Sequence, residues 1–157
     1  MTKQEITEMN ERIGRESFSG YTSSEQPNWE IIEFSKDRFC SYDVLYTSGS
    51  TQDIIIGEIK FRAAYLQDAF DDWIIEQHKH LTLLETKRTL QLENPDKNIY
   101  IHYINFYKDN RKKPRIWDVT HPFDFGMLEL PENSNTSTAN YYNTPATKLH
   151  NNKAINL

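Results

Sequence analysis

Hydrophobic residues near the start of the chain recur at helical spacing. Ile6, Met9 and Ile13 lie three and four positions apart among Glu, Arg and Asn, which predicts a short amphipathic helix over residues 3–17. Gly20 and the Ser/Thr-rich stretch that runs to Pro27 are expected to end this helix. Its thin apolar stripe is the side that we expect to face the rest of the fold.

The next segments have the character of strands. Residues 29–34 and 39–46 are rich in β-branched and aromatic side chains, and residues 53–62 contain four isoleucines. Between the last two segments, residues 47–52 consist of turn-forming Thr, Ser, Gly and Gln. We therefore expect residues 39–46 and 53–62 to be neighbouring antiparallel strands of a hairpin.

After residue 62 the pattern changes to that of a helix, predicted over residues 63–92. Large apolar residues recur there at three- and four-residue steps, and the sequence Asn94-Pro95-Asp96 is expected to stop the helix. The residues of this stripe are Leu66, Phe70, Trp73, Ile74, Leu81 and Leu84. Residues 99–107 then predict a strong strand, and residues 115–119 a shorter one. The predicted order of elements is α-β-β-β-α-β-β.

The C-terminal part of the chain has a different composition. From Pro131 onward, Asn, Thr and Ser dominate, with scattered tyrosines, a composition that buries little apolar surface. We predict one folded domain over residues 1–130 and a polar, flexible tail over residues 131–157. A chain of 157 residues is long enough for one domain with a real core and too short for two ordinary ones.

Composition and charge narrow the class of protein. Aromatic residues make up 13% of the chain and charged residues 26%, as in a folded domain. The net charge of -5 argues against a general nucleic-acid coat protein, although a local basic patch can still hold a phosphate backbone. The single cysteine, Cys40, cannot form an internal disulfide. No signal region or long apolar run is present, so we expect a cytoplasmic protein without a membrane span.

Charged residues interrupt the isoleucine-rich strand partway along its length. Side chains alternate between the two faces of a strand, so Glu58, Lys60 and Arg62 share one face with Ile54 and Ile56. A carboxylate and an ammonium group are costly to bury on a central strand unless they are paired, solvated or bound to a metal. One face of this strand is therefore predicted to become ionic, and something must compensate its charges.

A second carboxylate is expected beside Glu58. Asp43 interrupts the apolar residues of the preceding strand, and hairpin pairing across residues 47–52 can bring it next to Glu58. Two carboxylates held together offer the hard oxygen ligands that Mg²⁺ prefers. The sequence thus predicts a site suited to phosphodiester chemistry, and the plain alternative is a structural ion pair at the end of the sheet.

This pattern resembles the PD-(D/E)xK nuclease superfamily, whose αβββαβ core carries an Asp on the second strand and Glu-x-Lys on the third. Asp43 matches the Asp, and Glu58-Ile59-Lys60 matches the Glu-x-Lys, while Tyr42 stands where the motif has Pro. The resemblance covers residues 3–120. It implies an α/β fold of the restriction-endonuclease type, with a central mixed sheet flanked by helices and an extra C-terminal strand. The strand pair over residues 103–118 also resembles that of small phage and bacterial members.

The resemblance implies metal-assisted hydrolysis with Mg²⁺ or Mn²⁺. Asp43 and Glu58 would ligate the metal, with the main-chain carbonyl of Ile59 as a further ligand. Lys60 would orient or help deprotonate the attacking water and offset charge on the phosphate. Many members add an acidic residue from the first helix, and Glu16 is the preferred candidate because it continues the stripe of Ile6, Met9 and Ile13. Other acidic residues of this helix remain alternatives, namely Glu5, Glu8 and Glu11.

Weaker candidates for substrate binding lie outside the acidic pair. Gln77 lies on the predicted apolar stripe of the long helix, where a polar group needs a reason, and Arg62 follows Lys60 on the same strand face. Arg111, Lys112 and Lys113 lie in a basic loop that can reach a phosphate backbone. A solvated charge cluster is the plain alternative for that loop.

These observations lead to three competing functions. The first is a DNA endonuclease, of phage or mobile-element type, that cuts a duplex, a junction or a flap. The second is a catalytically inactive nuclease-fold module that binds nucleic acid or a protein. The third is a virion or partner-binding protein, such as a phage structural or accessory protein, in which the polar tail docks onto another chain. DNA is the expected partner for the first, and a homodimer is left open because nucleases that cut both strands often pair.

Overall fold

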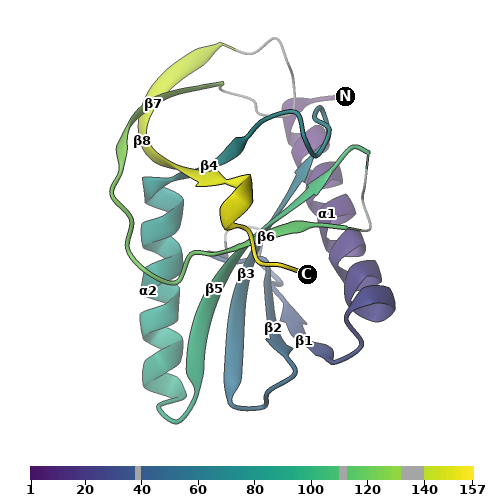
Figure 1. The fold of residues 1–157 in the computed structure, drawn as a ribbon, viewed down its shortest axis with the longest axis vertical. Coiled ribbons are helices and arrows are strands. Elements are labelled where there is room, and N and C mark those ends of the chain that lie inside the picture. The colour runs from purple at the N-terminus through teal and green to yellow at the C-terminus, as the bar shows by residue number, and fades with distance from the viewer. Residues whose placement is uncertain (38–39, 110–112, 132–139) are drawn as a thin grey trace.

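The computed structural model of this protein describes residues 1–37, 40–109, 113–131 and 140–157 (Figure 1). It has an α/β architecture, with a five-stranded mixed sheet, two long helices and a second sheet of three strands. The two helices lie on opposite sides of the central sheet, and the second sheet lies toward one end of it (Figure 1). Among the described residues, no helix combines the length and the apolar character needed to cross a membrane.

The central sheet has the strand order β1-β2-β3-β5-β6. Its strands are β1 (Trp29–Phe34), β2 (Val44–Ser48), β3 (Asp53–Arg62), β5 (Asn98–Tyr107) and β6 (Arg115–Asp118). Strands β3 and β5 pair in parallel, while β1, β2 and β6 are antiparallel to their neighbours. The predicted hairpin is confirmed, although its first strand was expected over residues 39–46 and starts only at Val44. The turn between β2 and β3 contains Gly49 with a φ of 98°, a left-handed conformation that favours glycine.

The alternation along β3 produces two separate cores. Helix α1 (Lys3–Glu25) covers one face, where Phe18 and Tyr21 pack with Ile55 and other apolar residues of the sheet. On the opposite face, Leu83 of α2 (Gln77–Glu93) packs in a cluster with Ile54 and Ile56. Because both faces are covered, most of β3 is buried on each side. Its charged residues follow Ile54 and Ile56 on the face covered by α2.

Helix α1 is longer than the sequence predicts. It begins with a capping box between Thr2 and Glu5 and continues to Glu25, past Gly20. The hydroxyl groups of Ser and Thr residues near its end donate to carbonyl groups three or four residues earlier. Ser and Thr are weak helix formers, so their sequence does not predict this extension of the helix. Burial of Phe18 and Tyr21 against the sheet stabilises this last part, so tertiary packing overrides the weak helix formers.

The predicted helix over residues 63–92 is wrong in its first half. Residues 63–71 form turns, β4 (Asp72–Glu76) follows, and α2 starts only at Gln77. Strand β4 pairs with the C-terminal strand β8 (Tyr141–His150), with Trp73 opposite Leu149. Trp73 and Ile75 are buried while their neighbours are less so, which is the alternation of a strand. The helical spacing of the apolar residues before Gln77 was therefore accidental.

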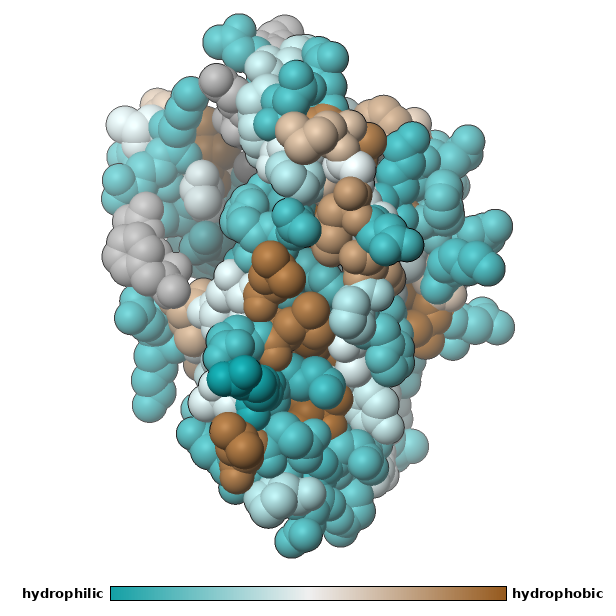
Figure 2. Space-filling model, turned by 90° about the vertical axis from the view of Figure 1, so that its left-hand side faces the viewer, coloured by the Kyte–Doolittle hydropathy of each residue, from teal (hydrophilic) through white to brown (hydrophobic). Residues whose placement is uncertain are grey.

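The surface over α2 shows the same correction. Figure 2 looks onto the side where α2 lies, and apolar patches appear there among hydrophilic side chains. Leu81, expected on the buried stripe, is 54% exposed, and Leu92 is 78% exposed. The buried side of α2 is instead formed by His80 and Leu83, because the helix starts later and presents a different face to the sheet.

The C-terminal residues belong to the fold, so the prediction of a loosely attached tail is wrong for residues 141–157. Strand β8 lies between β4 and β7 (Gly126–Pro131) in the second sheet, and its residues Ala146 and Leu149 are buried. A short 3-10 helix, η1 (Asn151–Lys153), follows. The main-chain N–H of Ile155 then donates to the carbonyl of Ile116 on β6 at 2.7 Å. Hydrogen bonds to other strands therefore hold this segment in the fold, although its polar composition favours a flexible chain.

The approach of β2 to β3 depends on Gly57. A Cβ atom placed there would lie 2.6 Å from Cγ1 of Val44 and 3.3 Å from Cδ1 of Ile104, which is closer than packed carbon atoms allow. Gly20, within α1, has nothing within 4 Å of the same position. The two glycines therefore differ in packing.

We expect Gly57→Ala to lower the free energy of unfolding by about 1–3 kcal/mol, since the added methyl group overpacks the sheet. Gly20→Ala should raise the free energy of unfolding by roughly 0.5–1 kcal/mol. Alanine has fewer backbone conformations than glycine in the unfolded chain, so it loses less entropy when the helix forms. Urea denaturation followed by circular dichroism measures both. Equal effects of the two substitutions would contradict the close approach of β2 to β3.

Candidate functional site

Asp43 lies immediately before β2, where the hairpin meets the middle of β3. The β2–β3 ladder begins with Val44 opposite Gly57, so Asp43 is one position beyond it and Glu58 is the next residue on β3. The main-chain N–H of Asp43 donates to the carbonyl of Gly57 at 2.9 Å, and its carbonyl accepts from Ser35 at 2.8 Å. Contacts on both sides therefore fix Asp43 at the place that the sequence predicts.

Two donors hold the carboxylate of Asp43. The main-chain N–H of Ile59 donates to its Oδ2 at 2.7 Å, and Nη2 of Arg15, on α1, lies 3.6 Å from its Oδ1. Arg15 also donates to the carbonyl and the hydroxyl of Ser35, each at 2.8 Å. Helix α1 thus contributes a cation to this site, and Arg15 had not been singled out from the sequence.

Glu58 is buried and carries two ammonium groups on one oxygen. Its side chain is 4% exposed, and its Oε1 lies 3.0 Å from Nζ of Lys60 and 3.2 Å from Nζ of Lys79. A buried carboxylate without partners would be strongly destabilising, so the two lysines compensate the charge that the sequence analysis identified as costly. Of the compensations that the sequence left open, pairing is the one present for Glu58.

Lys79 belongs to this site, although the sequence did not identify it as a site residue. It lies in the first turn of α2, where a positive charge opposes the helix dipole. Contact with Glu58 offsets that cost. A lysine in the first turn of a helix is an unusual feature that would have drawn attention to Lys79. The predicted helix start at residue 63 instead placed Lys79 in the helix interior.

The two carboxylates respond differently to this environment. Burial, and then the neighbouring charge of Glu58, raise the pKa of Asp43 from 3.8 to about 6, although the Ile59 hydrogen bond lowers it. Burial also acts to raise the pKa of Glu58, but Lys60 and Lys79 outweigh it and hold that pKa below its usual value. The carboxylate of Glu58 in turn raises the pKa of Lys60. Lys60 therefore carries its positive charge at neutral pH.

The donor set fits a magnesium ion in its chemistry. Within the described ranges, no group of three or more His, Cys, Asp or Glu side chains is placed to hold a metal. Mg²⁺ does not need such a group, since it keeps several waters and is often bound by one or two carboxylates together with phosphate oxygens. Burial, and then the nearby negative charge of Glu58, raise the pKa of Asp43, and a divalent cation would favour the ionised form against both effects.

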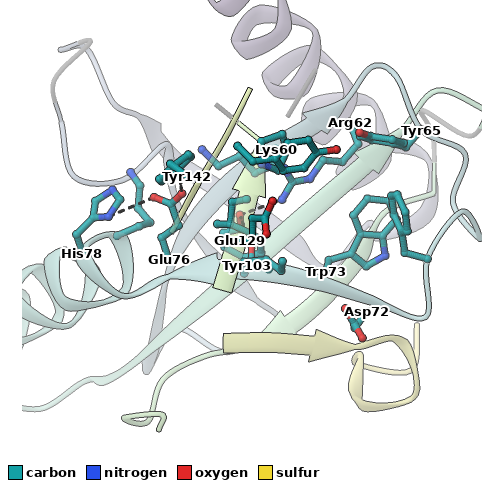
Figure 3. A pocket seen from close by; sticks show the side chains of 16 residues that line it. Lys60, Arg62, Tyr65, Asp72, Trp73, Glu76, His78, Tyr103, Glu129 and Tyr142 are labelled. Atoms are coloured by element: carbon teal, nitrogen blue, oxygen red, sulfur yellow. Dashed lines mark hydrogen bonds and ion pairs between the residues drawn. The ribbon is translucent and has the colours of Figure 1, made fainter. Parts of the chain in front are cut away.

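A cavity of about 530 Å³ is lined by Lys60 and Lys79, the two lysines that pair with Glu58, whereas Asp43 and Glu58 themselves do not line it. Lys60 and Arg62 of β3 lie on one side of it, Trp73 of β4 on another, and Glu76 and His78 at the start of α2 (Figure 3). The other lining residues include Tyr65, Asp72, Lys79, Tyr103, Glu129 and Tyr142. The second sheet therefore forms part of the wall, so the C-terminal strands help to build the site.

Glu16 does not belong to this site, contrary to expectation. Its side chain is 70% exposed and lies 4.0 Å from Arg12 one turn earlier. The buried positions of α1 include Asn10, Gly14 and Phe18, and Glu16 lies about 200° around the helix from Gly14. The apolar stripe of Ile6, Met9 and Ile13, extended to Glu16, therefore predicts a different buried face of α1 from the one that packs on the sheet.

The weaker candidates separate into three groups. Arg62 lines the cavity, as its position on β3 suggests, whereas Gln77 and Lys113 do not line it. Gln77 is the first residue of α2, and Lys113 is exposed ahead of β6. Arg111 and Lys112 lie outside the described residues. The substrate-binding prediction is thus supported by position for Arg62 and not for Gln77.

The raised pKa of Asp43 predicts a specific pH dependence of stability. The folded protein binds more protons than the unfolded chain between pH 3.8 and about 6, so this carboxyl makes the folded state less stable as pH rises through that window. In Asp43→Asn the amide can still accept from Ile59 but does not ionise. We expect the variant to gain about 1–3 kcal/mol relative to wild type between pH 4.5 and 7. Urea denaturation at several pH values measures this, and parallel curves would contradict it.

Comparison with known proteins assigns no family to this geometry. No protein-family model matches the chain, and no curated protein or solved structure matches it. The interpretation of the site therefore depends on the residues of this chain alone.

Proposed function

We propose that this protein is a metal-dependent nuclease that hydrolyses phosphodiester bonds, with DNA as the expected substrate. The observation that carries the proposal is the convergence of Asp43 and Glu58, with Lys60 and Lys79 on the carboxylate of Glu58. A restriction-endonuclease-like core is part of the proposal. The succession of α1, three strands, α2 and the parallel strand β5 supports it, with β4 as an insertion before α2.

Asp43 and Glu58 are the residues that would hold Mg²⁺ or Mn²⁺, with the main-chain carbonyl of Ile59 as a further ligand. A bound metal would supply Lewis acidity and a more acidic water for attack on phosphorus. Arg15 and the main-chain N–H of Ile59 orient the carboxylate of Asp43. These contacts limit the motion of the Asp43 side chain, which must keep a fixed position to bind a metal.

The cationic residues of the site fit the charge of a phosphodiester. Lys60 and Lys79 both line the cavity, and their side chains are 39% and 29% exposed. Fixed cations of this kind stabilise the charge that develops on the phosphate oxygens during hydrolysis. Because its pKa is raised, Lys60 acts in this proposal by donating hydrogen bonds to water or phosphate, rather than by removing a proton.

We expect Lys60→Ala and Glu58→Gln to reduce Mg²⁺-dependent cleavage of DNA by roughly 100-fold or more, because each change removes a group that acts on the reacting phosphate. Cleavage of linear, branched and flapped DNA and of RNA, with Mg²⁺ or Mn²⁺, is the measurement. Circular dichroism should show that both variants keep the fold.

Glu16→Gln is the matched control, since it removes the same charge from an exposed position on α1. Its activity should equal that of wild type. The nuclease proposal fails if the wild-type protein cuts no form of DNA or RNA with either metal, or if Glu58→Gln is as active as Glu16→Gln.

A second candidate function is a nuclease-fold module that binds nucleic acid without cutting it. The observation that favours it is the double ion pair on Glu58, which already neutralises one of the two carboxylates that a metal needs. In such a module the charged residues would stabilise the junction of β3 and α2, and binding would not require metal.

Metal binding separates the two candidates. For the nuclease we expect Mn²⁺ to raise the melting temperature by several degrees at concentrations about 100 times its Kd, since a ligand of the folded state stabilises it by ~2.7 kcal/mol there. The effect should be stronger at pH 7 than at pH 5, because Asp43 must lose its proton to bind a metal. It should disappear in Asp43→Asn. Absence of a shift in wild type would favour the binding module.

A further inference from the structure

The cavity beside Lys60 has an aromatic wall that phosphodiester hydrolysis does not require. Tyr65, Phe70 and Trp73 form a contiguous cluster, with ring centroids 5.1 Å apart for Tyr65 and Phe70 and 5.3 Å apart for Phe70 and Trp73. Phe70 is 47% exposed, although it belongs to this cluster. An exposed large aromatic ring at the edge of a cavity offers a surface on which a flat group can stack.

A further aromatic side chain reaches the cavity from the second sheet. Tyr142 of β8 lies beside Glu76, while Tyr65 and Trp73 lie across the cavity from it (Figure 3). The hydroxyl of Tyr142 donates to Glu76, and this contact ties β8 to the start of α2. The cavity therefore has aromatic side chains on two sides, contributed by segments far apart in the chain.

Polar groups in the cavity are divided between the two signs of charge. Lys60 and Lys79, on the Glu58 side, can attract a phosphate, and Arg62 also lines the space. Asp72, Glu76 and Glu129 line other parts of it. A ligand that carries a phosphate at one end and a flat ring with hydrogen-bond donors at the other matches this distribution.

Two buried N–H groups in the wall also have no acceptor. Among the described residues, Nε1 of Trp73 and Nε of Arg62 are buried side-chain nitrogens without a hydrogen-bond partner. Arg62 is held by other contacts: its Nη2 donates to the hydroxyl of Tyr103 at 3.2 Å, and its guanidinium carbon lies 5.8 Å from the centre of the Trp73 ring. Buried donors are usually satisfied, so these two nitrogens are unpaired polar groups next to the cavity.

We propose that this cavity binds one unpaired nucleobase of the nucleic-acid substrate, next to the phosphodiester that enters at Lys60 and Lys79. The proposal rests on the nuclease function proposed above and specifies its substrate as a strand with an unpaired nucleotide. A volume of about 530 Å³ lies within the range of roughly 300–1,000 Å³ of small-ligand sites. Aromatic stacking on a base is tolerant of base identity, so a preference for unpaired structure is expected rather than one for sequence.

A paired base could not use this cavity. In a duplex, each base is stacked between its neighbours, and its ring faces are covered until the nucleotide turns out of the helix. A flap, an overhang or a bulge exposes such a base without the energy needed to unpair it. The aromatic lining of the cavity thus favours DNA with a single-stranded segment over intact duplex.

Binding without cleavage tests the inference. Wild-type protein in buffer with EDTA is titrated with fluorescent DNA hairpins that are blunt or carry a short single-stranded overhang at either end. A second set carries one abasic position, moved stepwise along the overhang. We expect the hairpin with an overhang to bind about tenfold more tightly than the blunt hairpin, and one abasic position to remove that difference. An overhang with 2-aminopurine at the sensitive position should lose fluorescence on binding, as a stacked base does.

The variants assign the effect to the cavity. Phe70→Ala and Tyr142→Ala should each abolish most of the preference for the overhang, while binding to the blunt hairpin stays within about twofold. Tyr100→Ala is the matched control, since Tyr100 is a 36% exposed aromatic residue on β5 that does not line the cavity. Circular dichroism and urea denaturation of each variant show whether the fold is kept.

The outcomes for the cavity and for the nuclease are distinguishable. Equal affinity for blunt, overhanging and abasic hairpins overturns the base-binding inference, as does a loss in Tyr100→Ala that equals the loss in Phe70→Ala. If no DNA or RNA binds at all, the inference is also overturned. Base-dependent binding without cleavage in Mg²⁺ or Mn²⁺ supports the cavity and contradicts the nuclease. Cleavage that is unaffected by abasic positions supports the nuclease and contradicts the cavity.

Discussion

The carboxylate of Glu58 lies almost without solvent contact at the point where the sheet, the second helix and the second sheet meet, and its charge must be balanced there. Lys60 supplies one ammonium group from the same face of β3, and Lys79 supplies another from the first turn of α2. Removal of either partner would leave Glu58 less well compensated in a buried position. These ion pairs therefore hold the first turn of α2 against β3, and the remainder of the site lies around them.

The second sheet completes the site. Strand β4 pairs with β8, which returns from the end of the chain, and this pairing stops the apolar segment before Gln77 from continuing as a helix. Trp117 of β6 donates to the carbonyl of His150 at 2.8 Å, which connects the second sheet to the central one. Tyr142 and Glu129 then line the cavity at Lys60. Residues that resemble a flexible tail in composition thus form part of the wall of this cavity.

The candidate acidic pair could be predicted because its causes are local. Alternation along β3 puts Glu58 and Lys60 on one face, and a short turn brings the preceding strand alongside, with Asp43 next to Glu58. Both the period of a strand and the length of a hairpin can be recognised in a continuous stretch of about twenty residues. For the same reason, the predicted central strands over residues 29–34, 53–62, 99–107 and 115–119 agree with the observed ones within a few residues.

The wrong predictions have distant causes. Glu16 was assigned to the site from three apolar residues, but packing of Phe18 and Tyr21 on the sheet decides which side of α1 is buried. The start of α2, and with it the role of Lys79, depends on a strand about seventy residues later. The aromatic wall likewise combines turns after β3 with the last strand, which no local pattern connects.

By itself, the sequence determined the hairpin, the alternation of β3 and the acidic pair with its lysine, because strand period and turn chemistry act between near neighbours. Tertiary structure alone decided which face of α1 is buried, where α2 begins, and that the C-terminal strand closes the cavity. Those features follow from pairing and burial between segments far apart in the chain. The free energy gained from this pairing and burial exceeds the local secondary-structure preference of the segments. It is gained only when the distant segments come into contact.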